Sequence, residues 1–475
     1  MTSATRAVHG VLLPGFSGTS APGWLLDAAR DGLAGVVLFA GNTPDTPTTA
    51  ELTSALHVTS PGLLVAVDEE GGDVSRLQAV GGSFLPGAAA LGAVDDVVLT
   101  QRCGRALGDV LRASGVDLDL APVLDVASRP DSPVIGVRSF GAAPDLVARH
   151  GVAFLADLRA AGVAACGKHF PGHGNTAVDS HVSLPSLDVG LEQLSTRDLP
   201  PFRAAIDAGC DALMTGHLHV PCLGHAPASL EPAATRLVRD LGFTGPIVTD
   251  ALDMGALAED PGFGEACVRA LAAGADLLCL GTTAGRDDEA LFRTARDALL
   301  AAVGAGRISV ARLAQAAART AMLRRNLAAR RDRTDPMPLS QVMRVLEEVG
   351  AEAAARAVRT VGDVHLGPGD VVVDLRRRTD HAAASRSTAV TAVLAADLGM
   401  DVVPVDSRAV WVSARRVAVV TRDHDALLDD VLATRPDAVV LHTGVPEAAP
   451  RAANLALTYG VSLAGAREVA RRCAA

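Results

Sequence analysis

Aromatic residues are scarce in this chain of 475 residues: Phe, Trp and Tyr together make up 3% of the sequence. Aromatic rings supply the large apolar surfaces on which long polysaccharides usually bind, so their scarcity favours a small soluble ligand. Basic residues are also outnumbered by acidic ones, 43 to 54. The formal net charge of −11 argues against nucleic acid and anionic membranes as partners. No apolar run reaches the roughly 18 residues that a membrane helix requires.

The cysteines form no recognisable pattern. There are seven, none in a CxxC pair, and their odd number and apolar surroundings predict reduced thiols. The N-terminal segment has a single Arg and an apolar stretch too short for a secretory signal. We therefore expect a cytoplasmic protein. The cysteines are Cys103, Cys166, Cys210, Cys222, Cys267, Cys279 and Cys473.

Strand-like apolar runs alternate with amphipathic helical stretches through the first 331 residues. Eight such units over about 300 residues predict an α/β fold with a closed (β/α)8 TIM-like barrel in residues 1–331. The alternative is a doubly wound sheet with similar strands. The expected helices include 23–33, 98–115, 144–162, 200–209 and 308–331. The expected strands are 8–15, 35–42, 63–72, 116–126, 163–170, 211–220, 246–254 and 275–281.

A second unit follows a charged, Pro-containing linker, which we place at residues 332–345. Residues 346–475 predict a small α/β sandwich domain with a mostly parallel sheet. This unit has no phosphate-loop or dinucleotide fingerprint, and no feature that must reach an active site. We therefore expect either a structural role or a dimer-forming one, and the second role would make the protein a homodimer. Its expected strands are 370–375, 401–406, 416–423, 437–444 and 460–465.

The segment KHFPGHGNTAVDSHVSLP (168–185) is the most informative stretch of the chain. It begins within the fifth predicted strand and runs past its carboxyl end, where α/β barrels place their chemistry. Lys168 and His169 close that strand, and Asp179 and His181 follow in the loop. A histidine can donate and accept a proton near neutral pH, and a carboxylate two residues earlier can orient its ring.

Other polar groups recur at the predicted strand ends. Converging carboxylates and cations suit sugar chemistry, because carboxylates accept hydrogen bonds from hydroxyl groups while Lys and Arg donate them. Asp250 taken alone is equally well explained as a helix N-cap, and one of Glu69 and Glu70 is expected to be merely structural. Asp119 and Asp125 are interpreted as hydrogen-bonding residues at the barrel rim. The strand-end groups are Asp68, Glu69, Glu70, Arg138, His217, His219 and Asp250.

Two histidine pairs have spacings that metal sites also use. They are His169 with His173, and His217 with His219. A Pro-Gly loop separates the first pair, which disfavours a helical metal site. We expect neither a metal nor an organic cofactor.

Eight motifs follow one another along the first 254 residues. In order, they are VLLPGFSGTSAPGWL, DEEGGDVSRL, APVLDV, GVRSFG, KHFPGHGNTAVDSHVSLP, MTGHLHVP, PASL and VTDALDM. Together they resemble glycoside hydrolase family 3, and in particular its β-N-acetylglucosaminidase branch. The resemblance covers residues 8–330 and implies a barrel that hydrolyses glycosides with retention and without a metal. One departure is DEEGG, which has Glu69 where the family pattern has Gln.

The resemblance also implies roles for individual residues. Asp250 matches the catalytic nucleophile, His181 the acid/base, and Asp179 the carboxylate paired with it. The residues that match the family's sugar-binding positions are Asp68, Arg138, Lys168 and His169 and, less securely, Arg76 and His217.

We therefore predict a retaining exo-β-N-acetylglucosaminidase with a covalent glycosyl-Asp intermediate. The resemblance implies a small glycoside substrate with a terminal GlcNAc, such as a peptidoglycan-derived fragment. Because a neutral imidazole adds no negative charge beside an incoming anion, a phosphorylase with the same site is the first alternative. The second is a non-catalytic sugar-binding or regulatory protein.

Overall fold

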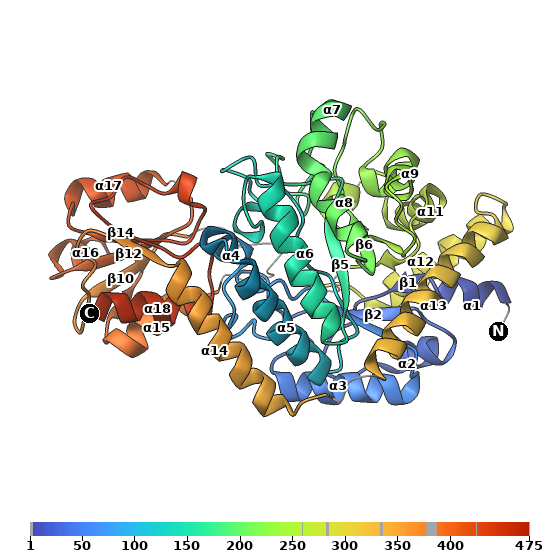
Figure 1. Cartoon of the computed structure of the whole chain (residues 1–475), viewed down its shortest axis with the longest axis horizontal. Helices are drawn as coiled ribbons and strands as arrows, with labels where there is room; N and C mark the ends of the chain where they lie inside the picture. The colour runs from blue at the N-terminus through green and yellow to red at the C-terminus, as the bar shows by residue number, and fades with distance from the viewer. Residues whose placement is uncertain are drawn as a thin grey trace.

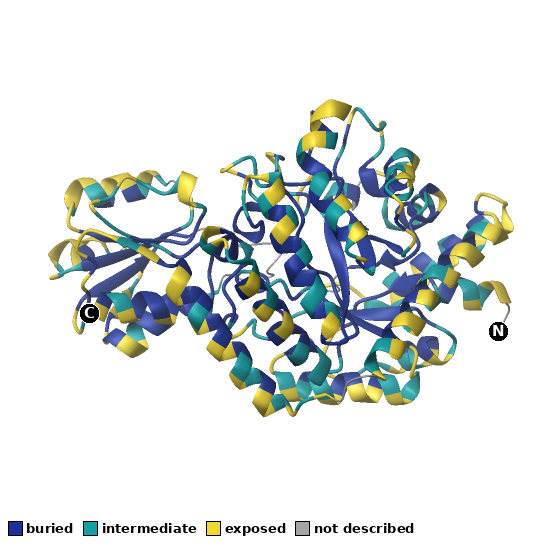
Figure 2. Ribbon diagram, in the orientation of Figure 1, coloured by how far each residue is buried: buried dark blue, intermediate teal, exposed yellow. Residues whose placement is uncertain are grey.

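The computed structural model describes residues 3–258, 260–281, 285–332, 336–376, 387–423 and 425–474. Figure 1 shows two units, a larger one on the right that contains the N-terminus and a smaller one on the left that contains the C-terminus. The long helix α14 (Leu339–Ala357) runs between them. Buried residues concentrate on the central strands of both units and on the inward faces of the helices around them (Figure 2).

The larger unit is a ring of eight parallel strands, which confirms the predicted barrel. Six strands, β2 to β7, pair in sequence order, and β1 pairs with β8. The ring is completed by backbone hydrogen bonds from Val37 N to Pro14 O (3.0 Å) and from Thr249 N to Leu277 O (3.0 Å). The strands are β1 (Leu12–Leu13), β2 (Gly35–Leu38), β3 (Leu64–Val67), β4 (Leu118–Asp119), β5 (Ala164–Phe170), β6 (Ala212–Thr215), β7 (Ile247–Thr249) and β8 (Leu278–Cys279).

Each strand lies within its predicted range, and the helices are where the sequence pattern placed them. Most observed strands are shorter than expected, because the carboxyl-terminal part of several predicted runs belongs to the loops above the ring. The helices of this unit are α1 (Ser3–His9), α2 (Gly23–Arg30), α3 (Thr46–Thr59), α4 (Ala88–Val94), α5 (Val97–Ala113), α6 (Pro144–Ala160), α7 (Leu191–Gln193), α8 (Pro200–Asp207), α9 (Pro232–Asp240), α10 (Gly255–Ala258), α11 (Phe263–Ala273), α12 (Asp288–Gly304) and α13 (Val310–Arg331).

Helix α13 covers the end of the ring where the strands begin. Leu323 and Leu327 pack against the small and branched side chains that fill the barrel interior. Arg324 donates to the carbonyls of Leu33 and Ala34, just before β2. Arg312 likewise donates to a backbone carbonyl just before β8. Arg331 donates to backbone carbonyls just before β4 and β5. Because this end is covered, ligands must enter from the carboxyl ends of the strands, as in other barrels of this kind.

The smaller unit is a three-layer α/β/α domain. Its sheet has the order β11-β10-β12-β13-β14-β9, with only β9 antiparallel. Alternate residues of the central strands pack on opposite layers, with α15 and α18 on one face and α16 and α17 on the other. The elements are β9 (Arg359–Val361), β10 (Val371–Asp374), α15 (Ala389–Leu398), β11 (Asp401–Val403), α16 (Arg408–Ser413), β12 (Val417–Thr421), α17 (Ala426–Thr434), β13 (Val439–His442), β14 (Asn454–Leu457) and α18 (Leu463–Ala474).

One predicted strand of this domain is wrong. The fifth parallel strand is β14 at Asn454–Leu457, whereas residues 460–465 form a turn and the start of α18. Strand β9 was not predicted. Its residues are half exposed, so they carry none of the apolar pattern from which a buried strand is predicted.

A helix begins within the segment that the sequence predicts to be a linker, residues 332–345. Helix α14 starts at Leu339, and its apolar side chains join the core cluster around α5 and α6. Residues 333–335 of the expected linker lie outside the described residues. Among the helices that the structure describes, none is long and apolar enough to cross a membrane.

Candidate active site

A cavity of about 360 Å³ opens at the carboxyl ends of the barrel strands. Seven of the nine predicted site residues line it, although they are spread over nearly 200 positions of the chain. The geometry of the barrel brings them together, because they lie near the carboxyl end of β5 or in the loops that follow β3, β4, β5 and β7. The seven residues are Asp68, Arg76, Arg138, Lys168, His169, His181 and Asp250.

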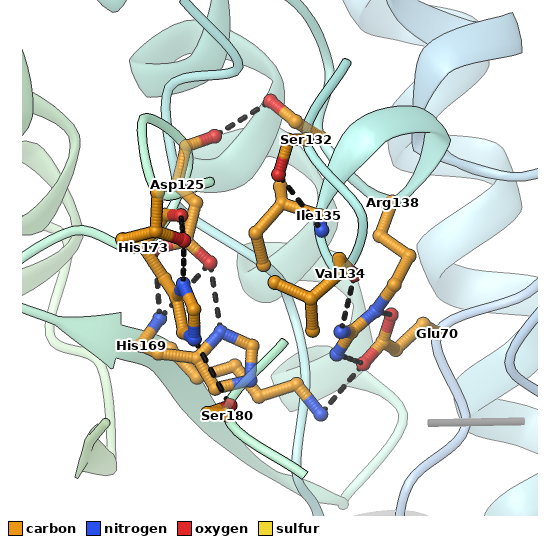
Figure 3. A network of polar contacts seen from close by, with 12 residues as sticks. Glu70, Asp125, Ser132, Val134, Ile135, Arg138, His169, His173 and Ser180 are labelled. Carbon is orange, nitrogen blue, oxygen red and sulfur yellow. Dashed lines mark hydrogen bonds and ion pairs between the residues drawn. The ribbon is translucent and has the colours of Figure 1, made fainter. Parts of the chain in front are cut away.

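Lys168 lies at the centre of a buried charge cluster on one wall of this cavity. Its Nζ lies 2.7 Å from Asp68 Oδ1 and 2.7 Å from Glu70 Oε1. Arg138 forms a bidentate pair with the same Glu70, with distances of 2.9 Å and 2.7 Å (Figure 3). The cluster therefore presents both carboxylate oxygens and cationic donors, which is the combination that recognises sugar hydroxyls.

The cluster keeps all of its members charged. Burial raises the pKa of Glu70, but the neighbouring Arg138 and Lys168 outweigh it and hold this pKa well below its usual range. Burial likewise lowers the pKa of Lys168, and Asp68 and Glu70 more than reverse the effect. Such a network is costly to desolvate, so its value here is in fixed geometry rather than in stability.

His169 is oriented by a carboxylate behind it. Its Nδ1 donates to Asp125 Oδ2 at 2.7 Å, and Asp125 Oδ1 accepts the backbone N–H of His173 at 2.7 Å (Figure 3). This agrees with the interpretation of Asp125 as a rim hydrogen-bonding residue. His173, which the spacing also offered as a metal ligand, is buried, and its ring bonds Thr176 and Ser180 instead.

His181 and Asp179 form a hydrogen-bonded pair at the rim of the cavity. Nδ1 of His181 lies 2.7 Å from Asp179 Oδ1. The backbone N–H groups of Gly255 and Ala256 donate to the carbonyls of His181 and Ser180 at 3.2 Å. The loop that carries the pair is therefore attached to the segment directly after Asp250.

Asp250 follows β7 and is held from two sides. Its backbone N–H donates to Thr215 O at 3.0 Å, and its Oδ1 accepts from Ala251 N at 2.8 Å. Burial raises the pKa of Asp250, but His169, His217 and His181 around it outweigh burial and lower the pKa to about 2. The carboxylate is therefore ionised across the physiological pH range, as a nucleophile must be.

Of the described residues predicted for the site, His217 and Asp179 do not line the cavity. Asp179 hydrogen-bonds His181, which does line it. His217 is fully buried, and its ring nitrogens bond Ser229 Oγ at 2.6 Å and Ala251 O at 2.9 Å. His217 thus contacts the backbone beside Asp250 rather than the cavity, although it had been predicted to bind sugar.

Two cavity residues, Glu70 and Asp253, are not among the nine site residues predicted from the sequence, which favours a capping or structural role for Asp253. Glu70 lines the cavity and binds both Lys168 and Arg138, whereas its neighbour Glu69 points away and accepts the backbone N–H groups of Arg76 and Leu77. Asp253 also lines the cavity, and burial raises its pKa to about 6. For Glu69 and Glu70 the sequence does hold a usable signal, because the side chains of adjacent residues in extended backbone point to opposite sides.

The match to known proteins agrees with this geometry. A model of the glycosyl hydrolase family 3 N-terminal domain matches residues 26–323. The chain belongs to glycosyl hydrolase family 3. The match covers most of the barrel, including every predicted site residue, so the family assignment and the cavity refer to the same part of the chain.

Two beta-hexosaminidases from named organisms resemble this chain over different lengths. Beta-hexosaminidase A of Pseudoalteromonas piscicida is 32% identical over 325 residues, 63% of this chain and 54% of that protein. Beta-hexosaminidase LpqI of Mycobacterium tuberculosis (strain ATCC 25618 / H37Rv) is 42% identical over 232 residues, 46% of this chain and 59% of that protein. The matched segment thus spans only somewhat more than half of each relative.

A solved family 3 structure matches the whole chain. It is a beta-N-acetylglucosaminidase from Paenibacillus sp. str. FPU-7, with a TM-score of 0.88 and 30% identity. The alignment covers 100% of this chain and 97% of that one. The arrangement of a barrel followed by a smaller α/β domain is therefore shared with a solved member of the family.

Proposed function

We propose that the protein is a retaining exo-β-N-acetylglucosaminidase in which Asp250 is the nucleophile and His181 the acid/base. The observation that carries the proposal is the meeting of an ionised carboxylate and an imidazole–carboxylate pair at one small cavity. The choice of N-acetylglucosaminides rests on the names of the family 3 relatives.

The environment of Asp250 suits nucleophilic attack on an anomeric carbon. Retaining glycosidases need a carboxylate that forms a covalent glycosyl intermediate beneath the sugar ring. The histidines that lower the pKa of Asp250 keep it anionic, and its hydrogen bond from Ala251 N fixes one oxygen. The other oxygen would then attack, and the developing oxocarbenium charge would be stabilised by the same carboxylate.

The pairing of His181 with Asp179 suits proton transfer. Because a carboxylate can only accept, Nδ1 of His181 carries the proton of that hydrogen bond, and exchange with the substrate would pass through Nε2. Asp179 would stabilise the imidazolium form that donates to the leaving group. After departure of the aglycone, the neutral ring would accept a proton from water in the second step.

The charge cluster would bind the terminal sugar. Asp68 and Glu70 can accept hydrogen bonds from hydroxyl groups, and Lys168 and Arg138 can donate them. At about 360 Å³ the cavity is at the lower end of the range for small-molecule sites, roughly 300–1,000 Å³. This size supports removal of one terminal residue at a time from a small glycoside, such as a peptidoglycan-derived GlcNAc fragment.

Phosphorolysis is the second candidate, favoured by one specific observation. The acid/base is an imidazole, and Lys168, Arg76 and Arg138 line the same cavity. An incoming phosphate would meet less repulsion here than beside an acid/base carboxylate. It would attack the glycosyl-Asp250 intermediate in place of water and release a sugar 1-phosphate.

One assay separates these functions. The purified protein should hydrolyse p-nitrophenyl β-N-acetylglucosaminide with much higher kcat/KM than p-nitrophenyl β-glucoside, and the first-formed GlcNAc should be the β-anomer. Added phosphate that accelerates turnover and yields GlcNAc 1-phosphate would favour the phosphorylase. Absence of turnover on every aryl glycoside, with GlcNAc still bound, would favour a non-catalytic sugar-binding protein.

A cytoplasmic location remains part of the proposal. All seven cysteines are free thiols, and six of them are buried. A reducing compartment preserves such thiols.

A further inference from the structure

The two cavity residues Glu70 and Arg138 lie next to segments that contact the second domain. Glu70 begins a tight turn, which a hydrogen bond from Glu70 N to Val74 O closes (2.9 Å). Asp73 lies in this turn, three residues after Glu70. Gly71 and Gly72 adopt positive φ angles of 80° and 61°. A Cβ on Gly72 would lie 2.6 Å from the backbone of Gly87, so the turn is packed tightly and has little freedom to shift.

The second domain binds Asp73 through the segments that follow β12 and β14. Val461 N donates to Asp73 Oδ2 at 2.9 Å, and Arg422 Nη1 lies 3.3 Å from Asp73 Oδ1. The Asp73 side chain is only 7% exposed. Leu463 N also donates to Ser83 O at 2.8 Å, farther along the same barrel segment.

The same part of the second domain supports the segment of Arg138. Val137 belongs to a small apolar cluster with Tyr459 and Ala357. A Cβ on Gly460 would lie 3.6 Å from Val137 Cγ2 and 2.6 Å from Asp73 Oδ2, so Gly460 fits between the two barrel segments. Tyr459 has a φ of 55°, which is unfavourable for a residue with a side chain. Such strain persists only where the surrounding contacts impose it.

We infer that the Tyr459–Val461 segment and Arg422 are positioning elements for catalysis. They hold the Glu70–Arg138 pair in the position where Glu70 contacts Lys168. The inference rests on the proposed glycosidase function. In the described part of the second domain, no side chain lines the cavity. The second domain therefore affects the cavity indirectly, through its contacts with Asp73 and Val137, each of which lies within three residues of a cavity residue. The second domain would thus act on the active site without reaching it, beyond the structural or dimer-forming role expected from the sequence.

A small displacement would be sufficient to reduce the rate. The Glu70–Arg138 pair has two distances below 3 Å, and Glu70 shares one oxygen with Lys168. A shift of about 1 Å at such a site can lower the rate about 100-fold. Loosening the Asp73 contacts should therefore reduce kcat/KM even though Asp73 never meets the substrate.

The test is a double-mutant cycle between Asp73→Ala and Glu70→Gln, assayed in the full-length chain on p-nitrophenyl β-N-acetylglucosaminide below the melting transition of every variant. Asp73→Ala should lower kcat/KM about 10- to 100-fold in the wild-type background and far less when Glu70 is already Gln. Asp73→Asn keeps an acceptor for Val461 N and should retain more activity than Asp73→Ala. An equal loss in both backgrounds would overturn the inference.

The matched control is Arg102→Ala. Arg102 and Glu352 form an exposed pair, 2.7 Å apart, between α5 and α14. This variant should keep the wild-type kcat/KM, and Arg422→Ala should not. If Asp73→Ala and Arg102→Ala behaved alike, the second domain would be only a structural attachment.

Hydrogen–deuterium exchange tests the same contacts without any turnover. In Asp73→Ala, amides in residues 70–76 and 136–140 should exchange faster than in Arg102→Ala. Unchanged exchange in both segments would refute the inference, whatever the protein hydrolyses. Failure of the wild-type protein to act on any aryl glycoside would instead refute the proposed function.

Discussion

The carboxylate of Asp179 binds His181 twice, because its Oδ1 accepts both the ring Nδ1 at 2.7 Å and the backbone N–H at 2.9 Å. Asp363 and His365 repeat this local geometry on the surface of the second domain, with distances of 2.7 Å and 3.1 Å. The Asp-x-His turn alone is therefore not a catalytic signature. Its position at the cavity rim distinguishes the first pair from the second.

His181→Ala should impair glycosides with poor leaving groups far more than aryl glycosides with good ones, since only the former require protonation. General acid catalysis contributes about 10²–10⁴-fold, which sets the expected loss. A plot of log kcat/KM against leaving-group pKa should become steeper. His365→Ala, its surface counterpart, should leave the plot unchanged. A defect that is the same for all leaving groups would remove His181 from this role.

Asp250→Ala should abolish turnover without lowering the melting temperature greatly, because the side chain supplies the attacking oxygen. A 5-fluoro GlcNAc derivative should trap the covalent intermediate, and mass spectrometry of the digested protein should find the label on Asp250. Asp253 is the informative alternative, since it also lines the cavity. A label on Asp253 would transfer the nucleophile to that residue.

Glu70→Gln should lower kcat/KM by more than tenfold. The substitution removes the negative charge that pairs with Lys168 and Arg138, and a lost hydrogen bond to a charged group costs about 1.5–3 kcal/mol. Steady-state kinetics on the aryl N-acetylglucosaminide give the measurement. Glu347→Gln, which affects an exposed pair with Arg467, is the control and should be kinetically silent. Equal kinetics for the two variants would contradict the role assigned to Glu70.

Glu69→Gln should change how stability depends on pH. Burial raises the pKa of Glu69 above its ordinary value of 4.5, so the folded state binds this proton more tightly than the unfolded state. The resulting stabilisation is complete below pH 4.5 and is lost as pH rises through the folded pKa. The variant, which can still accept from Arg76 N and Leu77 N, should therefore gain stability relative to wild type with rising pH. Urea unfolding across a pH series measures this, and parallel curves for the two proteins would argue against it.

The barrel was predictable because buried parallel strands are continuous apolar runs and because polar residues follow each of them. The meeting of seven predicted residues at one cavity was predictable for the same reason, together with the distinctive loop at 168–185. Sequence could not tell Glu69 from Glu70, since only the direction of each side chain separates a backbone-binding carboxylate from a cavity residue. Nor could it place β14, because NLAL (454–457) becomes a strand only through pairing with β13 and β9.

The role of the second domain was missed for a further reason. Its contacts with Asp73 and Val137 join positions more than 300 residues apart, and no local pattern records them. In the sequence, Asp73 follows two glycines and has the pattern of an ordinary turn residue. Its function depends on a partner that sequence spacing cannot identify.

Ring closure also constrains how the chain can fold during synthesis. Leu12 pairs with Leu278, so the first strand made must wait without its second neighbour until β8, the last strand of the barrel, has left the ribosome. Helix α13 then has to arrive before the carbonyls at the start of the strands find their arginine donors. Until β8 pairs, the nascent barrel exposes apolar strand edges, which are aggregation-prone, and until α13 arrives the apolar interior is uncovered at the end where the strands begin. A nascent chain arrested before Arg331 should therefore need chaperone protection that the finished protein does not.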